Sequence, residues 1–128
     1  MIMKNVVLYE HYDGVRFILE RSLSEATEDI NIHSSSLKKD IKDIIDQNHV
    51  DLLITELSRA NSSGLELSRY ARKSSPDLKI IWITVLGCDV FRELKNKIGN
   101  IKCIEKPLEI KDFRRDVFKA LEMEYSGG

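Results

Sequence analysis

Short apolar runs recur along the chain, and most have the length and continuity of strands that are covered on both faces of a parallel sheet. The runs lie at residues 5–9, 30–32, 50–54, 78–83 and 101–105. The run at 30–32 is the weakest, because Ile30 and Ile32 alternate with polar neighbours. This alternation is typical of an edge strand.

An amphipathic segment follows each run, with apolar residues at the three- and four-residue spacing of one helical face. The predicted helices span residues 15–26, 37–45, 65–71, 90–98 and 110–121. Asp13 is placed as a cap for the first helix. Pro76 prevents the third helix from continuing, and Gly99 with Asn100 ends the fourth.

Strands that alternate with helices in this way predict an α/β fold with three layers. Each strand–helix–strand connection is right-handed, so the strands form one parallel sheet with helices on both faces. The carboxyl ends of the strands then meet along one edge of the sheet, which is where open parallel sheets bind ligands.

The length of 128 residues fits one domain, predicted at residues 1–124, with residues 125–128 as a tail or linker. A net charge of −1 gives no general attraction to nucleic acid or to an anionic membrane. No apolar run approaches the roughly 18 residues of a membrane helix, and the first residues lack a signal-peptide pattern. We therefore expect a cytoplasmic protein with no membrane partner.

The two cysteines, Cys88 and Cys103, form neither a disulfide framework nor a zinc pattern. Disulfides are rare in a reducing compartment. We therefore expect both cysteines to be free thiols.

Ionisable and hydroxyl side chains follow the predicted strands. They are Glu10 and His11, Glu56, Thr84 and Lys106. Topology alone makes this strand edge a candidate site, with Glu56 near its centre. The alternative for Glu56 is a solvated loop acid without a role.

In order and interval, these residues resemble the receiver domain of two-component response regulators, and the resemblance covers residues 3–123. Thr84 and the pair Lys106-Pro107 match the family pattern in full. Arg16, six residues after Glu10, also has a spacing common in that family. Gly64 matches the glycine that opens the third helix. The resemblance implies a flavodoxin-like sheet with strand order 2-1-3-4-5 and a cis bond before Pro107.

The chain departs from this family at the residues that accept phosphate and hold magnesium. Glu56 stands at the phosphoacceptor position, and Glu10 with His11 stands where the family has two acids. Imidazole is a poor substitute for a magnesium-binding carboxylate. Glu56 is one methylene longer than Asp, and a misplacement of that size costs roughly 10²-fold in rate. We expect phosphotransfer to be lost or feeble, magnesium binding to be weak, and no cofactor.

Lys106 and Thr84, which hold the phosphoryl group in receivers, remain as a candidate anion site. Glu56 could supply the anion itself by contacting Lys106 permanently; the alternative is a loose pairing in a static interaction module. Cys103 occupies the place of the family's aromatic switch residue, which puts the usual coupling to the far surface in doubt. A less favoured possibility is a zinc or manganese site formed by Glu10, His11 and Glu56.

The sequence predicts an atypical receiver, or pseudo-receiver, that acts in signal transduction through protein contacts and is not an enzyme. Its partner, a kinase or output domain, is expected on the face of residues 90–98, 101–105 and 113–121, and a homodimer is possible. One alternative is a working receiver that accepts phosphate from a histidine kinase with a divalent metal. Another is a small flavodoxin-like cofactor- or metal-binding domain.

Overall fold

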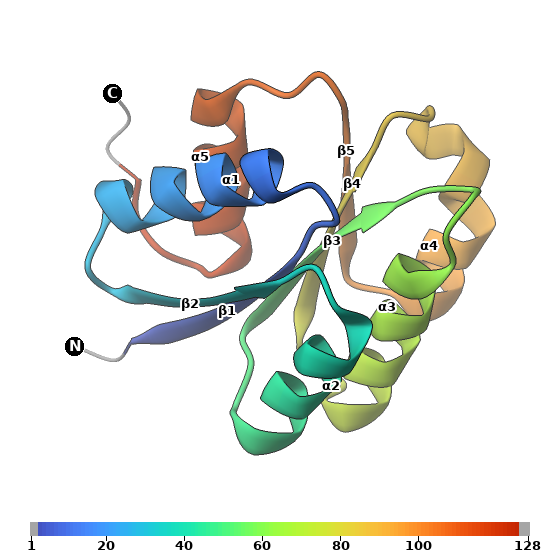
Figure 1. Ribbon diagram of the computed structural model, residues 1–128, viewed down its shortest axis with the longest axis horizontal. Helices are drawn as coiled ribbons and strands as arrows, with labels where there is room; N and C mark the ends of the chain where they lie inside the picture. Colours follow the sequence, from blue (N-terminus) through green and yellow to red (C-terminus); the bar gives the residue numbers. More distant parts are fainter. Residues whose placement is uncertain (1–2, 126–128) are drawn as a thin grey trace.

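The computed structural model describes residues 3–125, in which strands and helices alternate along the chain (Figure 1). The strands are β1 (Lys4–Tyr9), β2 (Ile30–Ser35), β3 (Leu52–Leu57), β4 (Lys79–Thr84) and β5 (Ile101–Glu105). The helices are α1 (Asp13–Ala26), α2 (Lys38–Gln47), α3 (Ser63–Ser74), α4 (Arg92–Ile98) and α5 (Ile110–Ala120), with a short 3₁₀ helix η1 (Cys88–Phe91) before α4.

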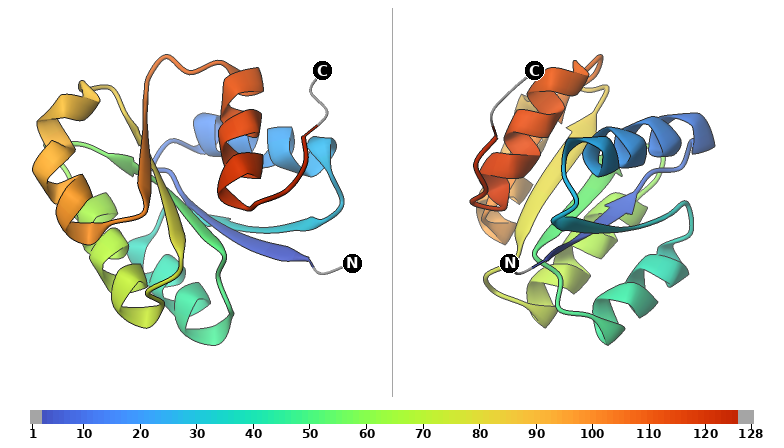
Figure 2. Two further views of the ribbon diagram at one scale, coloured as in Figure 1. Left: turned by 180° about the vertical axis from the view of Figure 1, so that it is seen from behind. Right: turned by 90° about the vertical axis from the view of Figure 1, so that its left-hand side faces the viewer.

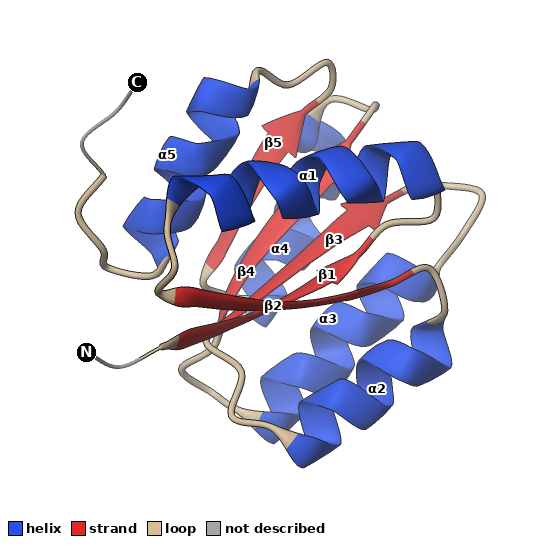
Figure 3. Ribbon diagram, turned by 60° about the vertical axis from the view of Figure 1, so that its left-hand side comes forward, coloured by secondary structure: helices blue, strands red, loops and turns tan. Residues whose placement is uncertain are grey.

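The strands form one five-stranded sheet in the order β2-β1-β3-β4-β5, and every neighbouring pair is parallel. Helices α1 and α5 cover one face, and α2, α3 and α4 cover the other (Figure 3). In the left view of Figure 2, the edge strand β5 lies between α4 and α5. The predicted three-layer α/β fold and its strand order are confirmed.

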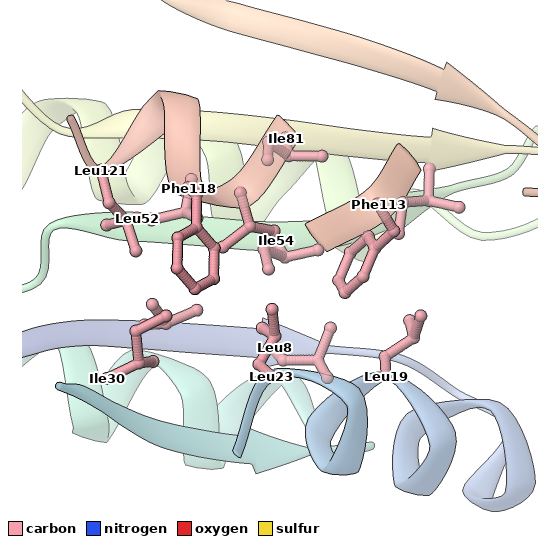
Figure 4. Packing of buried hydrophobic residues seen from close by; sticks show 13 residues of the cluster. Leu8, Leu19, Leu23, Ile30, Leu52, Ile54, Ile81, Phe113, Phe118 and Leu121 are labelled. Carbon is pink, nitrogen blue, oxygen red and sulfur yellow. The ribbon is translucent and has the colours of Figure 1, made fainter. Parts of the chain in front are cut away.

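The sheet separates two apolar clusters. The first packs β1, β3 and β4 against α1 and α5, where Leu8, Leu23, Ile54 and Phe113 face one another (Figure 4). The second packs the opposite face against α2 and α3 and contains Trp82, which is 0% exposed. Strands covered on both faces are almost wholly apolar, and for this reason their runs were visible in the sequence.

The indole of Trp82 has a polar and an aromatic neighbour within the second cluster. Its Nε1 donates a hydrogen bond to Ser68 Oγ on α3 at 2.8 Å. The ring of Phe91 in η1 meets it edge-on, with 6.1 Å between the ring centroids. Trp82 therefore lies in the core of the protein.

Several element boundaries differ from the sequence prediction. β3 continues to Leu57, so Glu56 lies within the strand rather than after it. Asp13 is not the cap of α1: Tyr12 holds the N-cap position without a side-chain hydrogen bond, and Asp13 pairs with Arg16 at 2.7 Å. β2 extends beyond the predicted run at 30–32 as far as Ser35, because its backbone pairs with β1 over that length.

The turn residues near the end of the chain behave mostly as expected. Lys106-Pro107 is cis, which confirms that prediction. Gly99 and Asn100 have φ values of 83° and 55°, the left-handed backbone that ends α4. Tyr125, which was assigned to the tail, packs its ring against Phe118 at a centroid distance of 4.8 Å. The rest of the predicted tail, 126–128, lies outside the described residues.

The expectation of two free thiols is wrong, because Cys88 and Cys103 form a disulfide. The fold brings η1 against β5, and the two Cα atoms lie 6.0 Å apart, in the usual range for a bonded pair. The separation of 15 residues gave no sign of this contact. Within residues 3–125, no helix is both long enough and apolar enough to cross a membrane.

Candidate functional site

The carboxyl ends of the central strands bring most of the predicted site residues together. Glu10 directly follows β1, Glu56 lies near the end of β3, Thr84 ends β4 and Lys106 follows β5. The backbone N–H of Lys106 donates to the carbonyl of Thr84 at 2.7 Å, so the β4 and β5 ends are joined at this point.

Glu10 is the most deeply buried acid of the site, with 1% of its surface exposed. Its Oε1 accepts a hydrogen bond from Lys106 Nζ at 3.3 Å, and its Oε2 accepts one from the backbone N–H of Tyr12 at 3.1 Å. The Lys106 side chain is 21% exposed. This ion pair is therefore largely removed from water, and each charge needs the other to offset the cost of its burial.

Of the two alternatives for Glu56, the permanent contact with Lys106 is not the one observed, because Lys106 forms its ion pair with Glu10. A buried charge without a partner is costly, so the ammonium group neutralises the more buried of the two carboxylates. Glu56 Oε1 instead accepts a hydrogen bond from the backbone N–H of His11 at 3.2 Å.

The pKa of Glu56 is raised above its ordinary value, first by burial and then by the charge and hydrogen bonding of Glu10. The His11 N–H and the Lys106 ammonium act in the opposite direction without overcoming these effects. Two neighbouring carboxyl groups disfavour the second ionisation. Glu56 thus keeps its proton to higher pH than an exposed glutamate.

Gly64, in the first turn of α3, allows this helix to lie against the end of β3. A side chain at this position would overlap the backbone carbonyl oxygen of Glu56, and it would also meet Leu57 and Thr55. Thr55 Oγ1 donates to the same Glu56 carbonyl at 3.1 Å. The close approach of helix and strand therefore fixes the backbone that carries Glu56.

His11 contributes its backbone rather than its imidazole. The side chain is exposed, and its ring meets Tyr12 edge-on at 5.3 Å between centroids. Among residues 3–125, no group of three or more His, Cys, Asp and Glu side chains is arranged to hold a metal ion. Glu10 already uses both oxygens on Lys106 and Tyr12. The donor set therefore does not fit the magnesium ion that the receiver resemblance implies, nor zinc or manganese.

Thr84 and Arg16 are held by local contacts. Thr84 is 1% exposed, and its Oγ1 accepts a hydrogen bond from the Leu86 N–H at 3.1 Å, so the hydroxyl oxygen stabilises the loop after β4. Arg16 Nη1 donates to the carbonyl oxygen of Glu10 at 3.0 Å and thereby ties α1 to the end of β1.

Arg72 on α3 is a positioning residue that the sequence analysis missed. Its guanidinium donates to several backbone carbonyls, including Leu78 at 2.6 Å and Gly99 at 2.7 Å. Burial lowers the pKa of this guanidinium below its usual value. Arg72 joins the turn before β4 to the turn after α4. Only the fold brings these carbonyls together, so the sequence held no signal for this role.

The strand order and this arrangement of strand-end residues are those of a signalling receiver. The sequence model of the response regulator receiver domain matches residues 6–118, and the chain therefore belongs to this family of two-component signalling domains. Receiver domains of this family act through protein partners in two-component signalling.

Particular relatives are similar over nearly the whole chain. The response regulator receiver protein CpdR of Brucella abortus is 24% identical over 93% of this chain and 98% of its own. The cyclic di-GMP phosphodiesterase response regulator RpfG of Xanthomonas campestris is 23% identical over 93% of this chain, which spans 32% of that protein. The response regulator TrrA of Thermotoga maritima, solved with Mg²⁺ and BeF, superposes with a TM-score of 0.76 at 23% identity, covering 93% of this chain and all of TrrA.

Proposed function

We propose that this chain is an atypical receiver that signals through protein contacts without phosphorylation of its strand-end carboxylate. The observation that carries this proposal is the ion pair between Glu10 and Lys106. The cation that receivers use for the phosphoryl group is here bound to a carboxylate of the same chain. Lys106 is therefore neutralised by Glu10 without a bound phosphoryl group.

The chemistry of Glu56 supports the proposal. Phosphoryl transfer to a carboxylate needs an ionised nucleophile in line with the leaving group. The raised pKa of Glu56 reduces its ionised fraction, and the hydrogen bond from the His11 N–H occupies Oε1. Both effects lower the reactivity of Glu56 as an acceptor.

The donor set gives independent support. A divalent cation neutralises the charge that develops during phosphoryl transfer, and magnesium requires several oxygen ligands in octahedral geometry. At the end of β1, one of the two family positions carries His11, whose ring is exposed. The other carries Glu10, which is bound to Lys106. Magnesium would have to displace Lys106 to reach Glu10.

We place the partner on the face formed by α4, β5 and α5. No residue of η1 or α4 is buried, and Val90 is 48% exposed. No residue of β5 is buried, and each is either half-buried or exposed. This face therefore offers side chains for a protein contact, with a kinase, an output domain or a second copy of the chain as the partner.

Treatment with acetyl phosphate and Mg²⁺, followed by intact mass measurement, tests the proposal. We expect no phosphoryl adduct on the wild-type protein. The matched control is the double variant Glu56→Asp/His11→Asp, which restores the acceptor length and the second acid and should gain an adduct. A stoichiometric adduct on the wild type would overturn the proposal in favour of a working receiver.

Calorimetric titration with Mg²⁺ provides a second measurement on the same two proteins. The wild type should show no saturation in the low millimolar range, because Lys106 already neutralises Glu10 and position 11 supplies no carboxylate. The double variant should bind more tightly, since it gains an oxygen ligand from Asp at position 11. Saturable low-millimolar binding by the wild type would contradict this reasoning.

A further inference from the structure

We infer that Cys88 and Cys103 form a reversible redox site whose reduction releases η1 and the start of α4 from the sheet. The disulfide joins η1 to the edge strand β5. Both cysteines are partly exposed, so a small or protein thiol can reach the bond. Exposed disulfides are the ones that exchange, whereas structural disulfides resist reduction.

The segment that the disulfide holds packs only partly buried side chains, those of Phe91, Leu94 and Ile98, against the second apolar cluster. α1, α2, α3 and α5 each bury two or more residues, whereas η1 and α4 bury none. α4 has only 7 residues, far below the length at which a helix is stable alone in water. The order of this segment therefore depends on its tethers.

Those tethers differ at the two ends of the segment. At the carboxyl end, Arg72 binds the carbonyls of Ile98 and Gly99. At the amino end, the Cys88 N–H donates to Glu105 Oε1 at 2.8 Å, and Phe91 contacts the Trp82 ring. Both of these are non-covalent contacts, and Cys88, Phe91 and Glu105 are themselves partly exposed or exposed. Reduction therefore frees the amino end and leaves the carboxyl end in place.

The disulfide also connects the two segments that carry the candidate anion site, one near Thr84 and one near Lys106. Cys88 follows Thr84 after the loop 85–87, and Cys103 lies in β5 just before Lys106. The N–H of Lys106 donates to the Thr84 carbonyl, so these neighbourhoods already share a backbone hydrogen bond. A change at the disulfide thus acts on the η1–α4 face and on the loop that Thr84 stabilises.

The reaction is thiol–disulfide exchange with a dithiol as the reductant. A thiolate of the dithiol attacks one sulfur, the Cys88–Cys103 bond breaks, and a mixed disulfide forms. The second thiolate of the dithiol then attacks the dithiol sulfur of the mixed disulfide and displaces the cysteine that is bound there. The dithiol loses two electrons and becomes a disulfide, and its two protons go to the two cysteine thiolates. A low-molecular-weight disulfide such as oxidised glutathione reverses the reaction.

Redox titration of the full chain in dithiothreitol and in glutathione buffers tests the inference. Alkylation and intact mass count the free thiols at each ratio, and amide hydrogen exchange follows residues 88–98. We expect interconversion without global unfolding. We also expect at least about tenfold faster exchange in that segment after reduction, since the disulfide closes a loop of 15 residues.

Helix α2 serves as the internal reference, and its exchange should not change. The variant Cys88→Ser/Cys103→Ser should exchange like the reduced wild type and should not respond to dithiothreitol. The inference is overturned if the cysteines stay reduced in every glutathione buffer, or if reduction requires unfolding. Unchanged exchange of residues 88–98 after reduction would overturn it equally. No phosphodonor or partner enters this experiment, so its outcome is separate from that of the proposed function.

Discussion

Replacing Lys106 by methionine removes the only cation paired with Glu10 among the described residues and keeps a side chain of similar length. Breaking a fully buried ion pair costs about 3–5 kcal/mol, whereas an exposed pair is worth about 0–1 kcal/mol. Glu10 is 1% exposed and the Lys106 side chain 21% exposed, so this pair lies nearer the buried limit. Glu10 also retains the Tyr12 N–H. We expect Lys106→Met to lower the free energy of unfolding by about 2–3 kcal/mol at pH 7.

Urea unfolding followed by circular dichroism measures this loss, and the variant Glu10→Gln/Lys106→Met is its control. If the loss comes from an unpaired carboxylate, neutralising Glu10 should recover most of it. A loss below about 1 kcal/mol, or a double variant no more stable than Lys106→Met, would refute the assignment of Lys106 to Glu10.

Three further substitutions test other parts of the site, each by denaturant unfolding. Gly64→Ala should cost about 2–3 kcal/mol, because the new methyl group overlaps the Glu56 carbonyl; the exposed Gly14→Ala is its control, since nothing lies near that position, and equal effects of the two would contradict the close approach. Arg72→Met should cost about 2–4 kcal/mol, because several carbonyls lose a charged donor, and a change under about 1 kcal/mol would show that water replaces it. Glu56→Gln should become more stable relative to the wild type as the pH rises above 4.5, the ordinary pKa of a glutamate. In that range Glu56 ionises in the unfolded wild-type chain, whereas in the folded protein its raised pKa opposes ionisation, so the wild type loses stability and the Gln variant does not. A difference that does not vary with pH would contradict the raised pKa.

The fold could be predicted from the sequence because local pattern and tertiary structure agree in most of the chain. β4 is buried at five of its six positions, and its run of apolar residues has no other explanation than a covered strand. The strand-end residues Thr84 and Lys106 followed from the same pattern, since the end of a run marks the edge of the sheet. The cis bond before Pro107 came from the family resemblance and is confirmed.

The side-chain pairings within the site could not be predicted, because they depend on how deeply each side chain is buried and not on the order of the residues along the sequence. Glu10 and Glu56 both follow apolar runs, and only the structure shows that Glu10 is the more buried and takes Lys106. The Cys88–Cys103 disulfide depends on where η1 meets β5. The spacing of the two cysteines in the sequence does not show that η1 packs against the edge strand β5.

The environment of Trp82 gives this protein an intrinsic optical probe of one face. It is the single tryptophan of the chain, and its indole is enclosed between the sheet and α3. Phe91, its edge-on neighbour, belongs to η1. Near-ultraviolet circular dichroism and emission from this one chromophore therefore describe the α3–η1 side, while the α1–α5 side contributes no indole signal. Unlabelled protein thus permits the motion of η1 to be followed in time.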